Sequence, residues 1–300
     1  MDKTYYIFGL YIQSAIPLPT LSSFAPHEVG VPDVIIEYGA TPDQLDRPQY
    51  KGVRYQCGPG EFLFHVDSVA HYYVSKGRRI IVTPVPGAAE ERILIFLLGS
   101  AMGALLHQRN ILVMHAGAIA VNGRSVLFSG CSGVGKSTLV AGFNQRGYPF
   151  LADDLCVISV VDGKPSVVPG FPYLKLWADV LTKLDKDKDQ LKSALWTKGL
   201  HKYFLPVASP QKIPIVLQSI FVLTTTNTEK IEIADLKGGE KIQPILKNTY
   251  RRRFLNGLGG KNEHFRQCGL VAAQTNVYKV TRPDKGFLLN DLMDMLAVNF

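Results

Sequence analysis

Residues 125–140 read SVLFSGCSGVGKSTLV, in which an apolar run leads into the pattern GxxxxGKS and then into a segment compatible with a helix. The glycines let the backbone turn its N–H groups towards phosphate oxygens, where side chains would block the approach. The helix expected over about residues 136–146 directs its positive N-terminus at the same anion. The pattern therefore predicts a nucleotide site rather than a structural glycine turn, formed by Gly130, Ser132, Gly133, Val134, Gly135, Lys136, Ser137 and Thr138.

Two side chains of this loop carry distinct chemistry. Lys136 is expected to supply a positive charge to the β and γ phosphates, and Ser137 offers a hydroxyl group to Mg²⁺. The expected roles of both residues follow directly from their positions in the pattern GxxxxGKS.

A hairpin is expected directly before the loop. Asn122-Gly123 separates the apolar run of residues 111–121 from the strand that enters the loop, and Asn-Gly favours a two-residue type I′ turn. If Val121 faces Arg124, counting back along both strands brings His115 opposite Gly130. His115 could then bind phosphate or steer a proton. The alternative is a hydrogen-bonded core histidine that only supports the loop.

An acidic pair follows the helix of the loop. Asp153 and Asp154 end the apolar stretch that begins after Gly147. Adjacent carboxylates repel each other and are costly to keep unless a cation or hydrogen bonds absorb their charge. This position suits a carboxylate that serves Mg²⁺ or the attacking group, although a helix cap or an exposed turn is the alternative.

The net charge of +8 suits an anionic partner such as a nucleotide or an acidic peptide. The basic residues are scattered, apart from the cluster at residues 251–253, and no basic stripe with interleaved aromatic residues is present. We therefore do not expect nucleic-acid binding. One of the clustered arginines could reach the phosphates, but a solvated basic helix face or a docking patch for an acidic peptide is the simpler interpretation.

The four cysteines are far apart and form no CxxC pair, which argues against a zinc site and against a disulfide framework. The N-terminal residues lack the pattern of a secretory signal. The longest uncharged apolar run, residues 93–106, is shorter than the ~20 residues that span a bilayer. These features predict a cytoplasmic protein that does not associate with a membrane.

The chain divides by pattern into a small β-rich domain, residues 1–86, and a larger α/β domain, residues 87–300. The first strand is expected over residues 5–13, and the segment 88–108 reads as one buried helix. Later helices are expected over residues 177–195, 242–255, 262–273 and 287–296. Later strands are expected over residues 155–161, 166–168, 215–223, 230–234 and 276–281.

Five ordered segments carry a family resemblance: HAGA from His115, the Asn-Gly hairpin, GCSGVGKST, RGY from Arg146, and LADD from Leu151. Together they resemble the catalytic domain of bacterial HPr kinase/phosphorylase, a protein-serine kinase akin in fold to phosphoenolpyruvate carboxykinase. The resemblance covers about residues 110–160. It implies a P-loop kinase domain with a mixed sheet, together with a β-rich N-terminal domain.

The resemblance also implies cofactors and roles. It implies ATP and Mg²⁺, with Asp153 as the general base and Asp154 holding Mg²⁺ or orienting the first carboxylate. His115 would lie close to the transferred phosphoryl group, and Lys136 would stabilise its charge. The bifunctional relatives form hexamers, so a homo-oligomer is compatible with the resemblance, but the oligomeric state stays open.

Two departures from the family narrow the expected reaction. Thr138 stands where the bifunctional enzyme usually has glutamate, and the segment EIRGLG, associated with phosphorylase activity, is missing after residue 155. A one-way serine kinase that acts on a peptide or small protein therefore fits better than a bifunctional enzyme. A metabolite kinase on the same fold, or a nucleotide-binding regulatory module without transfer, stays an alternative.

Two further segments narrow the resemblance to one branch. PGFPYLKLW at residues 169–177 and IPLP at residues 16–19 resemble HPr-kinase-like proteins found beside genes for ribosomal peptide biosynthesis. Some of these proteins phosphorylate the C-terminal serine of a lasso-peptide precursor. The resemblance thus implies a serine-bearing peptide as the acceptor.

Overall fold

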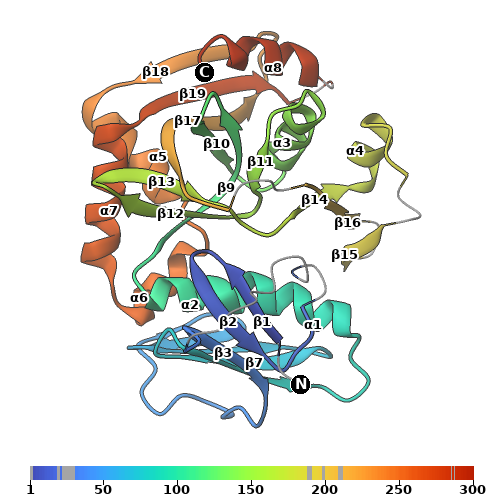
Figure 1. Cartoon of the computed structure of the whole chain (residues 1–300), viewed down its shortest axis with the longest axis vertical. Coiled ribbons are helices and arrows are strands. Elements are labelled where there is room, and N and C mark those ends of the chain that lie inside the picture. Colours follow the sequence, from blue (N-terminus) through green and yellow to red (C-terminus); the bar gives the residue numbers. More distant parts are fainter. Residues whose placement is uncertain are drawn as a thin grey trace. The chain divides into compact units, whose positions relative to one another are not determined.

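The computed structural model describes residues 3–18, 21, 31–187, 191–197, 200–208, 212–284, 286 and 288–300. The chain forms two compact units (Figure 1). Unit 1 comprises Met1–Val113 and Arg251–His264, and unit 2 comprises Met114–Tyr250 and Phe265–Phe300. The domain boundary expected near residue 86 remains a prediction, because compactness alone does not test which segments fold independently.

An eight-stranded mixed sheet forms most of unit 1, in the order β1, β2, β3, β8, β7, β6, β5, β4. The pairs β2–β3 and β3–β8 are parallel. Buried and half-buried residues alternate along β7, as expected for a strand with one face on a core. The strands are β1 (Lys3–Ile7), β2 (Leu10–Ser14), β3 (Val34–Tyr38), β4 (Tyr50–Lys51), β5 (Tyr55–Gly58), β6 (Glu61–Val66), β7 (Ala70–Ser75) and β8 (Arg79–Pro84).

The single strand predicted over residues 5–13 is wrong, because a tight turn divides it into β1 and β2. Phe8 and Gly9 both have positive φ, 57° and 77°, which is the conformation of a type I′ hairpin turn. Tyr6 pairs with Tyr11 across this hairpin, and their ring centroids lie 5.0 Å apart. A Phe-Gly turn carries a much weaker sequence signal than Asn-Gly, so the break was missed.

The apolar segment of residues 88–108 is helical, as predicted. It consists of α1 (Glu90–Phe96), a π-helical turn over Leu97–Ala101 and α2 (Met102–Gln108). The Tyr72 hydroxyl of β7 donates a hydrogen bond of 2.9 Å to the Ile93 carbonyl. The Gln108 side-chain amide donates to the Val74 carbonyl at 3.0 Å, so both ends of the helix are tied to β7.

The helix predicted over residues 242–255 is broken. α5 (Ile242–Lys247) ends early, and a 3₁₀ turn (Arg252–Phe254) and α6 (Leu255–Leu258) follow within unit 1. Phe254 packs against the rings of Tyr55 and Phe62, with centroids 4.8 Å and 4.5 Å away. Burial of this aromatic side chain stabilises a local structure that helix propensity alone does not predict.

The main sheet of unit 2 is also mixed, in the order β10, β9, β12, β13, β17, β19, β18, with β11 paired to β9. β10 lies between β9, which is antiparallel, and β17, which is parallel. The strand that enters the loop is thus one arm of the predicted hairpin. The strands are β9 (Leu112–Val121), β10 (Arg124–Gly130), β11 (Phe150–Ala152), β12 (Leu155–Val161), β13 (Lys164–Val168), β17 (Ile215–Thr226), β18 (Glu232–Leu236) and β19 (Asn276–Pro283).

Helices α3 (Lys136–Gln145) and α8 (Leu289–Ala297) pack against each other in unit 2. Gly142 of α3 faces Met293 of α8 so closely that a Cβ atom would lie 2.8 Å from the Met293 sulfur. Their apolar residues join one buried cluster with Phe128 and Phe221 of the sheet. α7 (Lys261–Gln274) lies to the left of β12 and β13 in Figure 1.

A separate three-stranded sheet was not predicted. It has the order β14, β16, β15 and consists of β14 (Tyr173–Trp177), β15 (Lys192–Thr197) and β16 (Leu200–Pro206). The helix predicted over residues 177–195 is therefore wrong beyond α4 (Ala178–Lys183), although its residues 188–190 lie outside the described part. Pairing of β16 with both neighbours supplies a hydrogen-bond ladder between segments that no local pattern connects.

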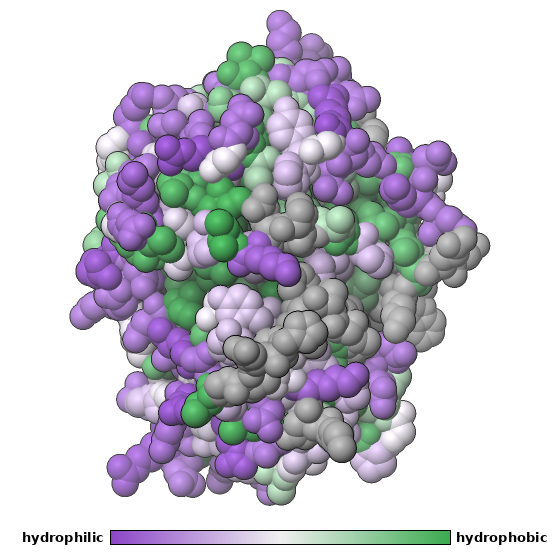
Figure 2. Space-filling model, viewed as in Figure 1, coloured by the Kyte–Doolittle hydropathy of each residue, from purple (hydrophilic) through white to green (hydrophobic). Residues whose placement is uncertain are grey.

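Hydrophilic side chains cover much of the face shown in Figure 2, and apolar residues occupy separate smaller areas of it. Among the described residues, no helix has the length and apolar character needed to cross a membrane.

Candidate nucleotide site

The loop between β10 and α3 has the backbone conformation that its glycines require. Gly130, Gly133 and Gly135 have positive φ values of 140°, 85° and 100°. A Cβ atom on Gly130 would lie 2.5 Å from the Leu223 carbonyl oxygen of β17. A residue with a side chain at this position would force the two parallel strands apart.

Lys136 begins α3 and is buried, with 6% of its surface exposed. Its Nζ donates to the carbonyl oxygens of Gly130 at 2.9 Å and Cys131 at 3.0 Å. Burial lowers the pKa of Lys136 below its usual range. The ammonium group thus lies inside the loop, and an anion there would compensate the desolvation that its charge suffers.

His115 lies where the hairpin register predicted. The pairing runs from Arg124 with Val121 to Ser129 with Ala116, which leaves His115 next in register to Gly130. Its ring stacks on Tyr250 with centroids 6.0 Å apart, and its Nε2 lies 3.8 Å from Oδ1 of Asp154. The register follows from the turn alone, but the contact with Asp154 depends on the fold.

Asp153 is buried, with 5% of its surface exposed. Its Oδ1 accepts a 2.8 Å hydrogen bond from the Ser137 hydroxyl, and its Oδ2 accepts one of 3.0 Å from the backbone N–H of Lys175. Burial, followed by the charge of Asp154, raises the pKa of Asp153 above its usual range and outweighs the stabilising effect of these donors.

Asp154 has the opposite electrostatic character. Its backbone has a positive φ of 68°, and its Oδ2 lies 3.0 Å from Nζ of Lys175. Burial alone would raise the pKa of Asp154, but the charges of Lys175 and His115 outweigh it and lower this pKa below its usual range. The two neighbouring carboxylates therefore differ: Asp154 stays ionised, whereas Asp153 holds a proton more readily.

Sequence reasoning missed four basic residues of the site, which are Lys175, Lys183, Lys202 and Arg282. Lys175 on β14 contacts both carboxylates, through its side chain and through its backbone N–H. Lys202 on β16 faces the same pocket, and Arg282 at the end of β19 donates from Nη2 to the Val134 carbonyl at 2.9 Å. Their positions depend on β14, α4, β16 and β19, and although Lys175 lies in the segment PGFPYLKLW, no local motif assigns a role in the site to any of them.

These groups line one pocket of unit 2 with a volume of about 260 Å³. The pocket brings together His115, the loop from Ser132 to Thr138, Asp153 and Asp154. Gly130 lies behind the lining, where its carbonyl holds Lys136. The predicted residues thus converge, while the arginine cluster at residues 251–253 belongs to unit 1.

Three oxygen-bearing side chains of the pocket suit a Mg²⁺ ion that also binds phosphates. They are the Ser137 hydroxyl and the two carboxylates, and Mg²⁺ binds through one or two carboxylates together with phosphate oxygens. Among the described residues, no group of three or more His, Cys, Asp or Glu side chains could hold a metal by itself.

No family model matches the sequence, and no curated protein matches it. Among solved structures, the chain is similar to the Hpr(Ser) kinase/phosphatase from Coxiella burnetii, with 14% sequence identity. The match covers 62% of this chain and 94% of that chain, with a TM-score of 0.33. A likeness this distant does not assign an activity, so the chemistry of the pocket has to support the function.

Proposed function

We propose that the chain is an ATP-dependent kinase that transfers the γ-phosphoryl group to a serine hydroxyl of a peptide or small protein. The observation that supports this proposal is the arrangement of one pocket. In it, Ser137 of a loop with the phosphate-binding pattern donates a hydrogen bond to Asp153, and a second carboxylate, that of Asp154, lies beside them. Phosphoryl transfer requires mainly positioning and charge stabilisation. This pocket supplies a buried lysine for the phosphates and carboxylates for a metal and for an acceptor proton.

The residues present fit ATP and Mg²⁺. Loop N–H groups and the N-terminus of the ten-residue α3 would bind the phosphates, with Lys136 at the β and γ phosphates. Ser137 and one carboxylate would hold Mg²⁺. Bound ATP supplies the phosphoryl group, and Lys136 stabilises the negative charge that develops as this group is transferred.

Asp153 is the proposed general base, with Asp154 beside the metal, as the sequence resemblance implies. The raised pKa of Asp153 supports this role, because a stronger base takes a hydroxyl proton more readily. The hydrogen bond between Ser137 and Asp153 favours the opposite assignment, in which Asp153 and Ser137 hold Mg²⁺ together and Asp154 is the base.

Two matched variants distinguish these assignments. Replacing the base by asparagine should lower kcat by ~10²–10⁴-fold at saturating Mg²⁺. Replacing the metal-side carboxylate should instead raise the Mg²⁺ concentration that gives half-maximal rate. We expect Asp153→Asn to show the first behaviour and Asp154→Asn the second. The reverse pattern would establish the exchanged roles, and wild-type kinetics in both variants would exclude this carboxylate pair from the reaction.

His115 is proposed as a neighbour of the transferred phosphoryl group. It lies in the pocket beside Asp154, and its ring is oriented by the stack on Tyr250. An imidazole in this place can contact a phosphate oxygen or stabilise the ionised carboxylate.

The acceptor is proposed from the sequence resemblance, which favours a serine-bearing peptide such as a lasso-peptide precursor with a C-terminal serine. The direct test is transfer of label from γ-³²P-ATP, with Mg²⁺, into serine-containing peptides and into a desalted extract of the source organism. Asp153→Asn serves as the inactive control. Label on a peptide or protein that disappears in the control supports the proposed kinase.

Two other outcomes would contradict the peptide kinase. Label on a small metabolite would indicate a metabolite kinase on the same fold. Nucleotide binding without transfer would indicate a regulatory module, although the buried carboxylate beside Ser137 favours chemistry over binding alone.

A further inference from the structure

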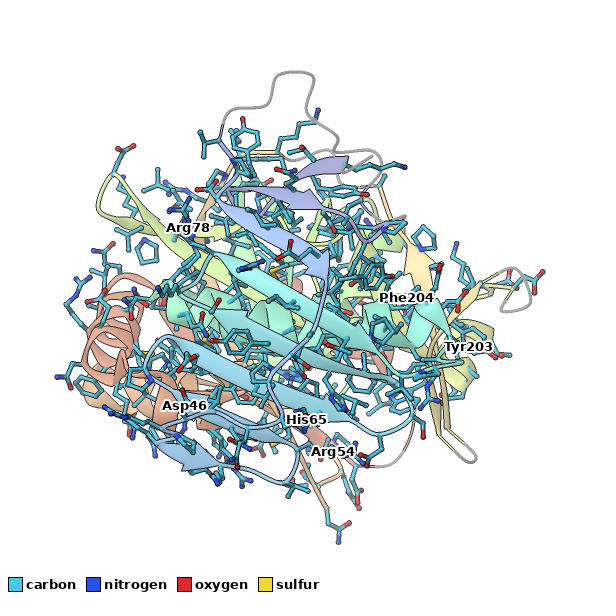
Figure 3. All side chains as sticks on the ribbon, turned by 90° about the horizontal axis from the view of Figure 1, so that it is seen from below. Asp46, Arg54, His65, Arg78, Tyr203 and Phe204 are labelled. Carbon is cyan, nitrogen blue, oxygen red and sulfur yellow. The ribbon has the colours of Figure 1, made fainter. Side chains whose placement is uncertain are left out.

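The three-stranded sheet presents a row of cationic and aromatic side chains to the pocket. Along β14, residues Lys175 and Trp177 project from the same face, because side chains alternate along a strand. In the register of the sheet, Phe204 of β16 faces Lys175, and Lys202 faces Trp177. Lys175, Trp177 and Lys202 all line the pocket that contains the phosphate-type loop. Figure 3 labels Phe204 on β16 next to Tyr203.

Most basic side chains of the pocket already have partners. Lys175 pairs with Asp154 at 3.0 Å, Lys183 pairs with Asp179 at 3.6 Å, and Arg282 donates to backbone carbonyls. Lys202 differs from them. Among the residues that the structure describes, no carboxylate pairs with it, and its Nζ lies over the Trp177 ring, 4.6 Å from the centroid.

The charge of Lys202 acts on two other residues that line the pocket, Lys136 and Asp154. It contributes to lowering the pKa of both Lys136 and Asp154, after the larger effects of burial and of their nearer neighbours. Two ammonium groups directed at one pocket repel each other unless an anion lies between them. A cation–π contact stabilises Lys202 without neutralising its charge, so its charge remains available for an anion on the loop.

We propose that Lys202 is a further catalytic residue, which binds the terminal phosphoryl group of the nucleotide together with Lys136. This inference rests on the proposed function for the identity of the anion, an ATP whose β and γ phosphates lie at Lys136. Trp177 is a positioning residue, because its ring holds the ammonium group of Lys202 at the pocket. The cation would stabilise the charge on the transferred group, as arginine residues do in other phosphoryl-transfer sites.

The decisive measurement is the ratio of affinities for a non-hydrolysable ATP analogue and for ADP, determined by calorimetry in the presence of Mg²⁺. Because only the analogue carries a terminal phosphoryl group, Lys202→Gln should weaken its binding about tenfold, equivalent to about 1.4 kcal/mol. Affinity for ADP should change less than about twofold. Lys202→Arg should retain the wild-type ratio, because it retains the charge. Lys279→Gln, at an exposed lysine of β19, is the matched control and should also keep it.

The outcomes separate this proposal from the proposed function. A wild-type protein that binds nucleotide but transfers no phosphoryl group would contradict the kinase, while the affinity ratio would still test Lys202. Equal weakening for ADP and the analogue, or no weakening in Lys202→Gln, would overturn the role of Lys202 while leaving the kinase intact. A wild-type protein that binds neither nucleotide would overturn both. Where transfer is observed, Lys202→Gln should also lower kcat by ~10²–10³-fold.

Discussion

The two units differ in the charged side chains that they bury. Among the described residues, the buried lysine and the buried aspartate, Lys136 and Asp153, both belong to unit 2 and line the same pocket. The buried polar side chains of unit 1 are serines and histidines, such as Ser14 and His107. Both sheets have eight strands and mixed pairing, so sheet architecture alone does not account for the difference.

Burying a charge costs free energy unless partners compensate it. The described residues of unit 1 avoid this cost, whereas those of unit 2 bear it in the pocket, where a loop, two carboxylates and four further basic residues converge. Such local departures from an apolar interior are expected at functional sites. The comparison therefore places the proposed site in unit 2, whereas the buried residues of the unit 1 sheet form an apolar core.

The strongest test of this comparison is a pair of substitutions, one in each unit. Lys136→Met should lower the transfer rate about 10³-fold, because it removes the cation at the phosphates. The free energy of unfolding should change by no more than about 1 kcal/mol, since relief of the buried charge offsets the lost hydrogen bonds. Ile36→Ala, at a fully buried residue of β3, should behave in the opposite way. It should lower the free energy of unfolding by about 2–5 kcal/mol and leave nucleotide affinity unchanged.

Chemical denaturation, nucleotide titration and the transfer of label from γ-³²P-ATP, applied to both variants, measure these effects. A large loss of stability in Lys136→Met would contradict the small stability effect expected for the site in unit 2. A loss of nucleotide affinity in the folded Ile36→Ala protein would show that the core of unit 1 also affects nucleotide binding.

The second test concerns the ion pair between Lys175 and Asp154, two residues that line the pocket. Lys175→Met should lower the free energy of unfolding by about 3 kcal/mol at neutral pH, because it leaves Asp154 half-buried without its cation. The pKa of Asp154 is lowered in the folded protein. The stabilising contribution of the pair is therefore fully present above the unfolded-state pKa of about 3.9 and is lost as the pH falls through the folded-state pKa.

Denaturation of wild type and Lys175→Met at several pH values checks this expectation. The difference in stability should narrow as the pH falls below about 4. A difference that stays constant over this range would mean that Lys175 stabilises unit 2 through packing rather than through charge.

The smallest expected effect belongs to a histidine pair of unit 1. His65 of β6 faces His71 of β7, with their rings stacked 4.2 Å apart, and its backbone N–H donates to the Arg54 carbonyl at 2.8 Å. Figure 3 shows the His65 and Arg54 side chains close together in this unit. Burial, followed by the charge of His71, lowers the pKa of His65, and this effect outweighs the opposing charges of Asp43 and Asp67.

Because its folded-state pKa is lowered, His65 takes up a proton more readily in the unfolded chain. Unit 1 should therefore lose stability as the pH falls from about 6.5, the unfolded-state pKa, through the folded-state pKa. His65→Phe should show a smaller decrease in melting temperature than wild type between about pH 7.5 and about pH 5.5. An equal decrease in both proteins would contradict the lowered pKa of His65, because it would mean that His65 binds a proton equally well in the folded and the unfolded chain.

The local parts of the site were predictable from the sequence. Asn122-Gly123 determined the hairpin register that leads to His115, because a two-residue turn leaves one pairing of its flanking strands. The spacing of glycines determined the loop, because positive φ and close approach of Leu223 exclude other residues. By contrast, the helix expected over residues 177–195 gave way to β15, because the ladder with β16 outweighs helix propensity.

The sequence by itself therefore determined a phosphate-type loop, the hairpin before it and an acidic pair after it, all within about residues 110–160. Each of these is a short-range feature, in which backbone conformation and spacing leave few alternatives. Only the tertiary structure decided how the two carboxylates differ, because Lys175 lies 21 residues from Asp154 and reaches it through β14. It also decided that Lys202 and Arg282 face the loop. Contacts between distant segments depend on strand pairing and core packing, which no local pattern specifies.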